Sequence, residues 1–252
     1  MSQAPDQSDL TSVELEPGES LLNRYRVQRK LGQGGMGVVW LAADDRFDGR
    51  DVAVKVLPPV LTSNRVAVQR LKREAEHCFK LKHPNIVSLF DFEIDEHRNS
   101  LPFLVMDFID GRTLAQVLYR YKEGVPLKPT LAWVRQIADA VDYVHNQRVL
   151  HRDLKPSNIM VNRQGHAHLM DFGISREIRD TVTNITGRRD IAGTVQYMSP
   201  QQLRGENTRS NDVYGLAATW YQLLGGRPPF HGGNLQHKIL TMEPAPIASL
   251  PD

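Results

Sequence analysis

The stretch VLHRDLKPSNIM, residues 149–160, decides the fold because it places polar groups where a chain would ordinarily be buried. His151, Arg152, Asp153, Lys155 and Asn158 stand there between apolar residues at both ends. A carboxylate such as Asp153 can accept a proton from a hydroxyl group, and the carboxamide oxygen of Asn158 suits Mg²⁺, which prefers oxygen ligands. One loop therefore carries the groups for acid–base chemistry beside a cation.

A second carboxylate follows in DFG, where Asp171 stands thirteen residues after Asn158. The intervening IMVNRQGHAHLM, residues 159–170, has the pattern of a β-hairpin. A hairpin returns the chain to its start, so we expect Asp171 to lie beside Asn158. HRD or DFG alone could occur by chance, but the two in this order and spacing indicate one functional site.

Glycines in LGQGGMGVV, residues 31–39, have the G-x-G-x-x-G spacing at Gly32, Gly34 and Gly37. Such glycines let the backbone approach phosphate oxygens closely. A second strand follows this loop, which excludes the dinucleotide-binding motif because that motif requires a helix there. Alone, the spacing is equally typical of a simple hairpin turn.

Lys55 ends the alternating strand VAVK and follows the glycine loop by about twenty residues. A lysine there is often merely exposed at a strand end, but its compact cation could also reach phosphates under the loop. Glu74 and Glu76 are the acidic residues that could hold it. Helical spacing places Glu74 on the inward side, one turn before Cys78, and Glu76 towards solvent.

The pattern of elements changes along the chain from strands to helices. We expect strands at 25–31, 38–43, 51–57, 86–92 and 102–108, and a helix at 64–80. Apolar residues at helical spacing predict further helices at 130–147 and 212–224, the second closed by Gly225 and Gly226. This order indicates two lobes of different class, joined near residues 107–111.

Composition excludes several classes of protein. The first 23 residues carry five acidic side chains and no Lys or Arg, so we expect a disordered acidic leader over 1–23. The single cysteine, Cys78, excludes an intramolecular disulfide and is expected in the core. No apolar run is long enough to span a membrane, and no basic run with interleaved aromatics indicates nucleic-acid binding.

In the order glycine loop, VAVK, HRDLKPSN, DFG and GT…SP, the motifs resemble a eukaryotic-type protein kinase catalytic domain over residues 25 to 241. GGMGVV and QYMSP are particularly similar to bacterial serine/threonine kinases. The resemblance implies an α+β, two-lobed fold. A small antiparallel-sheet N-lobe with one helix would span 24–107, and a mainly helical C-lobe 108–252, with its distal helices incomplete and the chain truncated at its C-terminus.

The resemblance also implies roles for single residues. Asp153 would accept the proton of the substrate hydroxyl, Lys155 would steady the γ-phosphate, and Lys55 would bind the α/β-phosphates while paired with Glu74. Asn158 and Asp171 would hold Mg²⁺, with Mn²⁺ as an alternative. Asp212 would anchor the catalytic loop, and His151 is expected to be structural. The implied ATP-binding residues are Leu31, Gly32, Gly34, Gly37, Val39, Ala53, Lys55, Met106 as gatekeeper, Asp107, Ile109 and Met160.

A regulatory segment is implied between DFG and YMSP. Thr194 matches the threonine that bonds the catalytic Asp and Lys, and Arg152, Arg176 and Arg70 would form a pocket for a phosphate. We expect autophosphorylation at Thr186 or Thr183, with Thr181 nearby. Gln201 departs from the family, which normally has Glu there.

The expected function is ATP-dependent transfer of the γ-phosphate to Ser or Thr hydroxyls of protein substrates, with the chain itself as a partner in trans, as a dimer. A pseudokinase scaffold that binds nucleotide without efficient turnover is the alternative. A small-molecule phosphotransferase is disfavoured by the long activation segment. We expect a cytoplasmic location, and a membrane anchor beyond residue 252 of a longer chain stays open.

Overall fold

The computed structural model describes residues 14–34, 37–172, 178, 181–183 and 194–247. The chain divides into two compact units. The first comprises Met1–Lys82, Ser88–Phe108 and Ile174–Asp190, and the second comprises His83–Val87, Ile109–Gly173 and Ile191–Asp252. The change between units after Phe108 falls in the stretch where the sequence analysis joins the two lobes.

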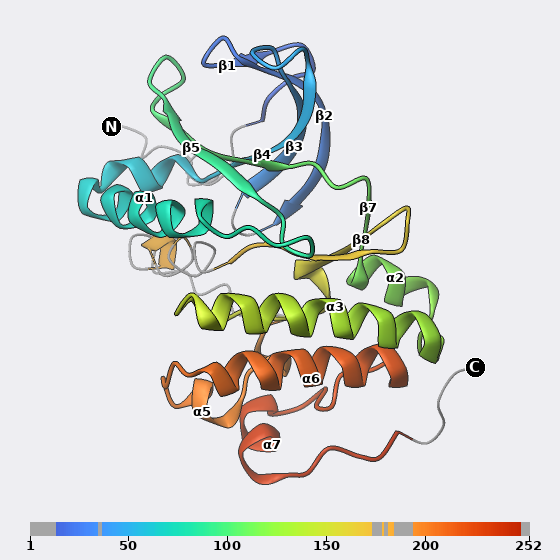
Figure 1. Ribbon diagram of the computed structural model, residues 1–252. Helices are drawn as coiled ribbons and strands as arrows, with labels where there is room; N and C mark the ends of the chain where they lie inside the picture. Colours follow the sequence, from blue (N-terminus) through green and yellow to red (C-terminus); the bar gives the residue numbers. More distant parts are fainter. Residues whose placement is uncertain (1–13, 35–36, 173–177, 179–180, 184–193, 248–252) are drawn as a thin grey trace, which may run out of the picture. The chain divides into compact units, whose positions relative to one another are not determined.

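A six-stranded antiparallel sheet forms most of the first unit (Figure 1). Its order is β1-β2-β3-β4-β6-β5. The strands are β1 Ser20–Leu21, β2 Tyr25–Gly34, β3 Gly37–Asp44, β4 Arg50–Val56, β5 Leu89–Asp95 and β6 Leu101–Asp107. Alternate side chains of these strands point to opposite faces, and one face is filled by a cluster that includes Val27, Trp40, Val54 and Phe103.

Residues 14–23 are folded against this sheet, with Ser20–Leu21 as its first strand, so the leader expected over 1–23 was wrong in its second half. Leu15 and Leu21 are buried in the apolar cluster, and β1 pairs with the start of β2. The Gly18 N–H donates to the carbonyl of Val27, whose own N–H donates to Glu19. The burial of these two leucines stabilises the folded segment, although its acidic composition is typical of a disordered one. Residues 1–13 lie outside the described part of the chain.

Helix α1, Arg65–Phe79, packs against the sheet after the short 3-10 helix Pro59–Ser63. It begins after Asn64, whose side-chain oxygen accepts hydrogen bonds from the N–H groups of Val66 and Ala67. Ala67, Leu71, Ala75 and Cys78 form its buried face. This helix confirms the expected helix at 64–80 to within a residue at each end.

The second unit is mainly helical and contains a small three-stranded sheet of order β7-β8-β9. Its strands are β7 Gly111–Thr113, β8 Ile159–Asn162 and β9 Ala167–Leu169. Its helices are α2 Leu114–Arg120, α3 Leu127–Asn146, α5 Pro200–Leu203, α6 Arg209–Gly225 and α7 Leu235–Thr241, with 3-10 turns at Pro156–Asn158 and Val195–Tyr197. Helices α3 and α6 lie side by side (Figure 1).

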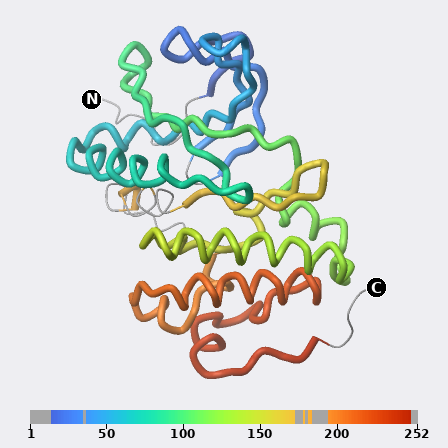
Figure 2. The backbone as a smooth tube through the Cα atoms, viewed as in Figure 1, coloured from blue at the N-terminus to red at the C-terminus, as the bar shows by residue number. Residues whose placement is uncertain are grey.

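After α7 the chain runs back beside α6, as Figure 2 shows. The Tyr221 hydroxyl donates to the carbonyl of Ala245 at 2.6 Å, which fixes this return. None of the helices in the described ranges is long and apolar enough to cross a membrane.

Two local expectations were incomplete. The strand expected at 86–92 begins later, at Leu89, because the N–H of Val87 donates instead to the carbonyl of Leu169 in the second unit. Helix α2 was not expected at all, although Thr113 and Gln116 form a capping box at its start.

Candidate active site

A buried carboxylate and an ammonium group form the centre of the site in the second unit. Asp153 is only 4% exposed, and its Oδ2 lies 2.9 Å from Lys155 Nζ. Lys155 Nζ also donates to Thr194 Oγ1 at 3.0 Å. Through Lys155, the loop between α3 and β8 thus contacts the segment around Thr194, 39 residues further along the chain.

Asn158 is oriented by its neighbour Asp153. Its Nδ2 donates to the Asp153 carbonyl at 2.8 Å and to Asp153 Oδ2 at 3.2 Å. Because the nitrogen is held in this way, the opposite atom, Oδ1, is presented as an acceptor, and its contact with Ser157 Oγ is a long 3.5 Å. An oriented amide oxygen fits the preference of Mg²⁺ for oxygen ligands.

The expected hairpin between Asn158 and Asp171 is present. Ile159 pairs with Leu169 across β8 and β9, and the N–H of Met170 donates to the carbonyl of Asn158 at 3.0 Å. Asp171 follows directly and has a φ of 64°, in the left-handed region that non-glycine residues rarely adopt. The two oxygen ligands expected for Mg²⁺ therefore stand at the open end of one hairpin.

His151 has both ring nitrogens in use. Nε2 bonds the Met170 carbonyl at 2.9 Å, so Nε2 must carry the proton, while Nδ1 accepts from the N–H of Asp153 at 3.3 Å. The ring is fully buried and meets the Phe172 ring edge-on, with centroids 4.9 Å apart. This environment supports a structural role for His151.

Asp212, buried at the start of α6, binds the backbone of the loop that carries Asp153. Its Oδ1 accepts from the N–H of Arg152 at 2.7 Å, and its Oδ2 accepts from the N–H of His151 at 2.9 Å. The same Oδ2 lies 2.8 Å from His145 Nε2 on α3. One carboxylate therefore joins α6, α3 and the loop that holds Asp153.

Two supporting residues were missed by the sequence analysis. A Cβ at Gly215 of α6 would lie 3.0 Å from the Leu154 carbonyl oxygen, so glycine gives helix and loop room for this close approach. Gln202 Nε2 donates to the Arg152 carbonyl at 2.9 Å. The only signal for Gly215 was a glycine inside a helical pattern.

The first unit holds most of the residues expected at the nucleotide. Lys55 is buried on β4, opposite Val39 of β3 and Leu104 of β6. Ala53 and the expected gatekeeper Met106 are register partners and are both buried. Leu31, Gly32 and Gly34 lie near the end of β2, Gly37 opens β3, and Asp107 ends β6.

Gly37 of the glycine loop is constrained by its own fold. Its φ of 124° is open to glycine alone, and a Cβ there would overlap the Val56 carbonyl. Helical spacing predicts Glu74 on the inward side and Glu76 towards solvent, and the exposures agree: Glu74 is half-buried and Glu76 is exposed. Met160 on β8 and Ile109 belong to the second unit and are half-buried.

The regulatory residues are only partly described. Thr181 and Thr183 are helical and half-buried, whereas Thr186 and Arg176 lie outside the described residues. Arg70 is exposed on α1, and Arg152 is half-buried with a φ of 68°. Arg152 Nε is buried without a hydrogen-bond partner among the described residues, so this guanidinium retains a donor for an anion.

Comparisons with known proteins agree with this geometry. The family described as "Protein kinase domain" matches residues 25–247. Serine/threonine-protein kinase PknB of Mycolicibacterium smegmatis is 40% identical over 219 residues, which are 85% of this chain and 34% of that protein. The Mycobacterium tuberculosis PknB is 41% identical over 217 residues, 84% of this chain and 34% of its own length. The chain therefore spans about a third of these relatives.

A solved structure gives the same result at the level of the fold. The PknI kinase domain of Mycobacterium tuberculosis aligns with a TM-score of 0.68 and 30% identity, covering 86% of this chain and 80% of that one. The sheet and helix of the first unit and the helical second unit are thus the two lobes of a known fold. By sequence, by fold and by the residues around Asp153, the chain belongs to the protein kinase domain family.

Proposed function

We propose that the chain is an ATP-dependent protein kinase that phosphorylates Ser and Thr hydroxyls of protein substrates. The observation that carries the proposal is the bridge from Lys155 Nζ to Asp153 Oδ2 at 2.9 Å and to Thr194 Oγ1 at 3.0 Å. It places a cation beside the carboxylate that would receive a proton. The relatives named as serine/threonine-protein kinases support the same class.

The proposed reaction is an in-line displacement. The substrate hydroxyl oxygen attacks the γ-phosphorus, the bond between that phosphorus and the bridging β–γ oxygen breaks, and ADP leaves with the electron pair. Asp153 orients the hydroxyl and takes its proton, while Lys155 offsets negative charge on the transferred group. The hydrogen bonds from Asp212 and Asn158 hold this loop before the substrate arrives.

Nucleotide binding would use the residues that the sequence predicts for it. Gly32, Gly34 and Gly37 would cover the phosphates, and Lys55, held by Glu74, would bind the α/β-phosphates. Asn158 Oδ1 and the Asp171 carboxylate would hold Mg²⁺, whose charge neutralises the phosphates of ATP when it is bound. The adenine would lie between apolar side chains, with its edge on nearby backbone: Leu31, Val39, Ala53, Met106, Asp107, Ile109 and Met160.

Activation is proposed to follow autophosphorylation in trans at Thr186 or Thr183. The Nε of Arg152, which has no hydrogen-bond partner among the described residues, supports an anion at this place, and Arg70 and Arg176 are proposed as further cations. Mapping of phosphosites after incubation with ATP would identify the residue. Unchanged activity of a triple Thr→Ala variant at 181, 183 and 186 would contradict this part of the proposal.

Radiolabelled ATP and Mg²⁺ test the function directly. We expect label on a generic protein substrate with the natural chain, and a loss of at least about a hundredfold in both Lys55→Met and Asp153→Asn. Lys128→Met, on an exposed residue of α3, is the matched control and should keep the natural rate.

A nucleotide-binding scaffold is the outcome that would overturn the proposal. In that case ATP would bind, as measured by calorimetry, but no label above the Asp153→Asn background would reach any protein. Equal labelling by all variants would indicate a contaminating kinase and would equally remove the support.

A further inference from the structure

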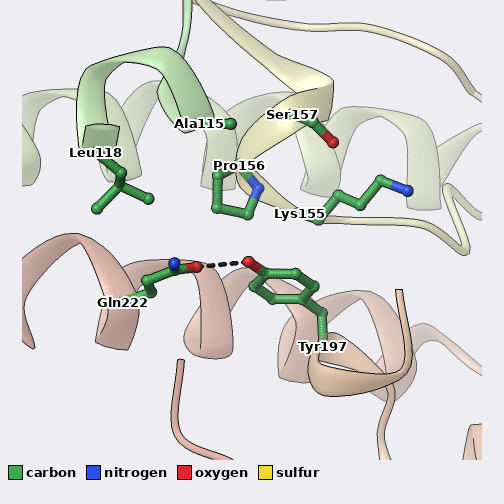
Figure 3. A pocket seen from close by; sticks show the side chains of 7 residues that line it. All are labelled: Ala115, Leu118, Lys155, Pro156, Ser157, Tyr197 and Gln222. Atoms are coloured by element: carbon green, nitrogen blue, oxygen red, sulfur yellow. Dashed lines mark hydrogen bonds between the residues drawn. The ribbon is translucent and has the colours of Figure 1, made fainter. Parts of the chain in front are cut away.

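A pocket of about 270 Å³ opens in the second unit directly beside the proposed catalytic loop. Figure 3 shows its walls: the loop residues and α2 lie on one side, and Tyr197 with Gln222 of α6 lies on the other. It is lined by Ala115, Leu118, Lys155, Pro156, Ser157, Tyr197 and Gln222. Neither the proton transfer nor the proposed nucleotide site uses this space.

The polar groups of the pocket are mostly donors. The Tyr197 hydroxyl donates to Gln222 Oε1 at 2.5 Å (Figure 3). Burial raises the pKa of Tyr197 to about 12, so the hydroxyl keeps its proton at neutral pH and remains the donor. Because Gln222 Oε1 is thereby engaged, the group left to a ligand is its Nε2, which has no partner among the described residues.

The charge of the lining residues also favours a ligand that accepts hydrogen bonds. Lys155 is its single charged residue, and none of the seven is a carboxylate. A guanidinium or ammonium entering this space would meet no anion to compensate its lost hydration. A carbonyl or carboxylate oxygen would meet the Gln222 amide and the Ser157 hydroxyl, while Ala115, Leu118 and Pro156 would pack against its methylene groups.

The pocket lies close enough to Asp153 to be reached by a substrate peptide whose hydroxyl is at the proposed reaction centre. Lys155 belongs both to the lining and to the pair with Asp153, at 2.9 Å. An extended peptide advances about 3.3 Å per residue. A peptide whose hydroxyl reaches Asp153 therefore places a side chain from within three residues of that hydroxyl over the pocket.

We propose that this pocket selects the protein substrate by receiving a side chain that ends in a carbonyl oxygen, Gln or Glu, and that it disfavours Arg and Lys. The inference rests on the proposed kinase function and names the substrate class of that site. Its discriminating element is Gln222, with the orientation of the amide fixed by Tyr197.

Peptide libraries with one fixed Ser or Thr, randomised over three residues on each side, test the selection. For the natural chain we expect one position at which Gln or Glu raises kcat/KM about tenfold over Arg. Separate Gln and Glu peptides at that position distinguish an amide ligand from a carboxylate ligand.

Gln222→Glu replaces the donor by a carboxylate of the same shape. We expect the ranking at this one position to reverse, with Arg now about tenfold above Gln. Ser157→Glu adds a carboxylate at an exposed residue of the lining and gives an independent route to the same reversal, even if the change on α6 impairs folding. Gln236→Glu, the same chemical change on the exposed face of α7, should leave the ranking of the natural chain.

The outcomes separate the two levels of the proposal. If the natural chain phosphorylates neither peptides nor a generic protein, the kinase function fails and the pocket inference falls with it. If phosphorylation occurs but Arg is preferred in the natural chain, or both Glu variants keep its ranking, the pocket inference alone is wrong.

Discussion

At the scale of single residues, two left-handed backbone conformations lie on either side of the residues that are proposed to react. Arg152 and Asp171 have φ values of 68° and 64°. Such conformations cost of order 1–3 kcal/mol each and persist only where surrounding contacts hold them. Arg152 is held through both backbone polar groups, its N–H by Asp212 and its carbonyl by Gln202. The strain at Arg152 is thus maintained beside Asp153, whose orientation matters for the proposed proton transfer.

Asp212→Asn tests this restraint. The amide has one acceptor oxygen, whereas the carboxylate receives hydrogen bonds on both oxygens from Arg152 and His151 and also contacts His145. A buried N–H would face the Asn nitrogen and stay unsatisfied, so we expect a loss of about 2–4 kcal/mol in the free energy of unfolding. Urea denaturation measures it.

The matched control is Asp142→Asn on the exposed face of α3, where the carboxylate accepts one hydrogen bond from Asn146. Its effect should stay within about 0.5 kcal/mol. Equal stability of the Asp142 and Asp212 variants would contradict a restraining role for Asp212.

The sequence predicted the site unevenly, and the reason is physical. Asp153, Lys155, Asn158 and Asp171 were singled out from the sequence because the proposed chemistry fixes both residue type and order. Gly215 was not, since its role depends on how closely α6 approaches Leu154, a packing distance that no local pattern encodes. The pocket around Gln222 was missed for the same reason: its walls come from four separate segments of the chain.

At the scale of elements, α6 ends in two glycines that have different roles. Gly225 is the last helical residue, and Gly226 is the left-handed cap with a φ of 71°. A Cβ at Gly225 would meet Ile247 at an ordinary 3.8 Å, whereas a Cβ at Gly226 would overlap the Lys122 carbonyl. The pair GG in the sequence marks the helix end but does not say which glycine is indispensable.

Alanine at the two positions should therefore have opposite effects. Gly226→Ala strains the backbone and displaces the Lys122 segment, so we expect a loss of at least about 2 kcal/mol of stability. Gly225→Ala adds a helix former in a helical conformation and should be neutral or stabilising by up to about 1 kcal/mol. Thermal unfolding of both variants provides the comparison, and a Gly225 variant less stable than the Gly226 variant would show that the cap assignment is wrong.

Elements with strong periodicity were predicted well, and short ones were not. Helix α1 buries one clear face, and the central strands β3 and β4 are buried along most of their length, so tertiary packing and sequence pattern agree. Helix α2 has seven residues and two buried side chains, too few for a visible period. The start of β5 depended on Val87 pairing with Leu169, which lies 82 residues away.

At the scale of the whole molecule, average composition was a poor guide to where the fold begins. The acidic start of the chain lacks Lys and Arg, yet Leu15 and Leu21 are 3% and 0% exposed in the cluster of the first unit. Glu19 also forms an ion pair with Arg98 at 3.1 Å. Disorder arguments average over a window, whereas burial is decided by individual side chains that find a complementary surface.

Two shortened chains measure what this segment contributes. The reference begins at residue 14, and the test chain begins at residue 24, so that they differ by β1, by the buried Leu15 and Leu21, and by the partly buried Leu22. Burying a leucine contributes about 1.5–3 kcal/mol, and the test chain should therefore unfold with about 3–5 kcal/mol less free energy than the reference. Leu21→Ala in the reference should account for about 2–4 kcal/mol of this difference, because it leaves a cavity beneath the sheet. Equal urea midpoints for the two chains would mean that residues 14–23 merely rest on the sheet, and the first unit would then begin at β2.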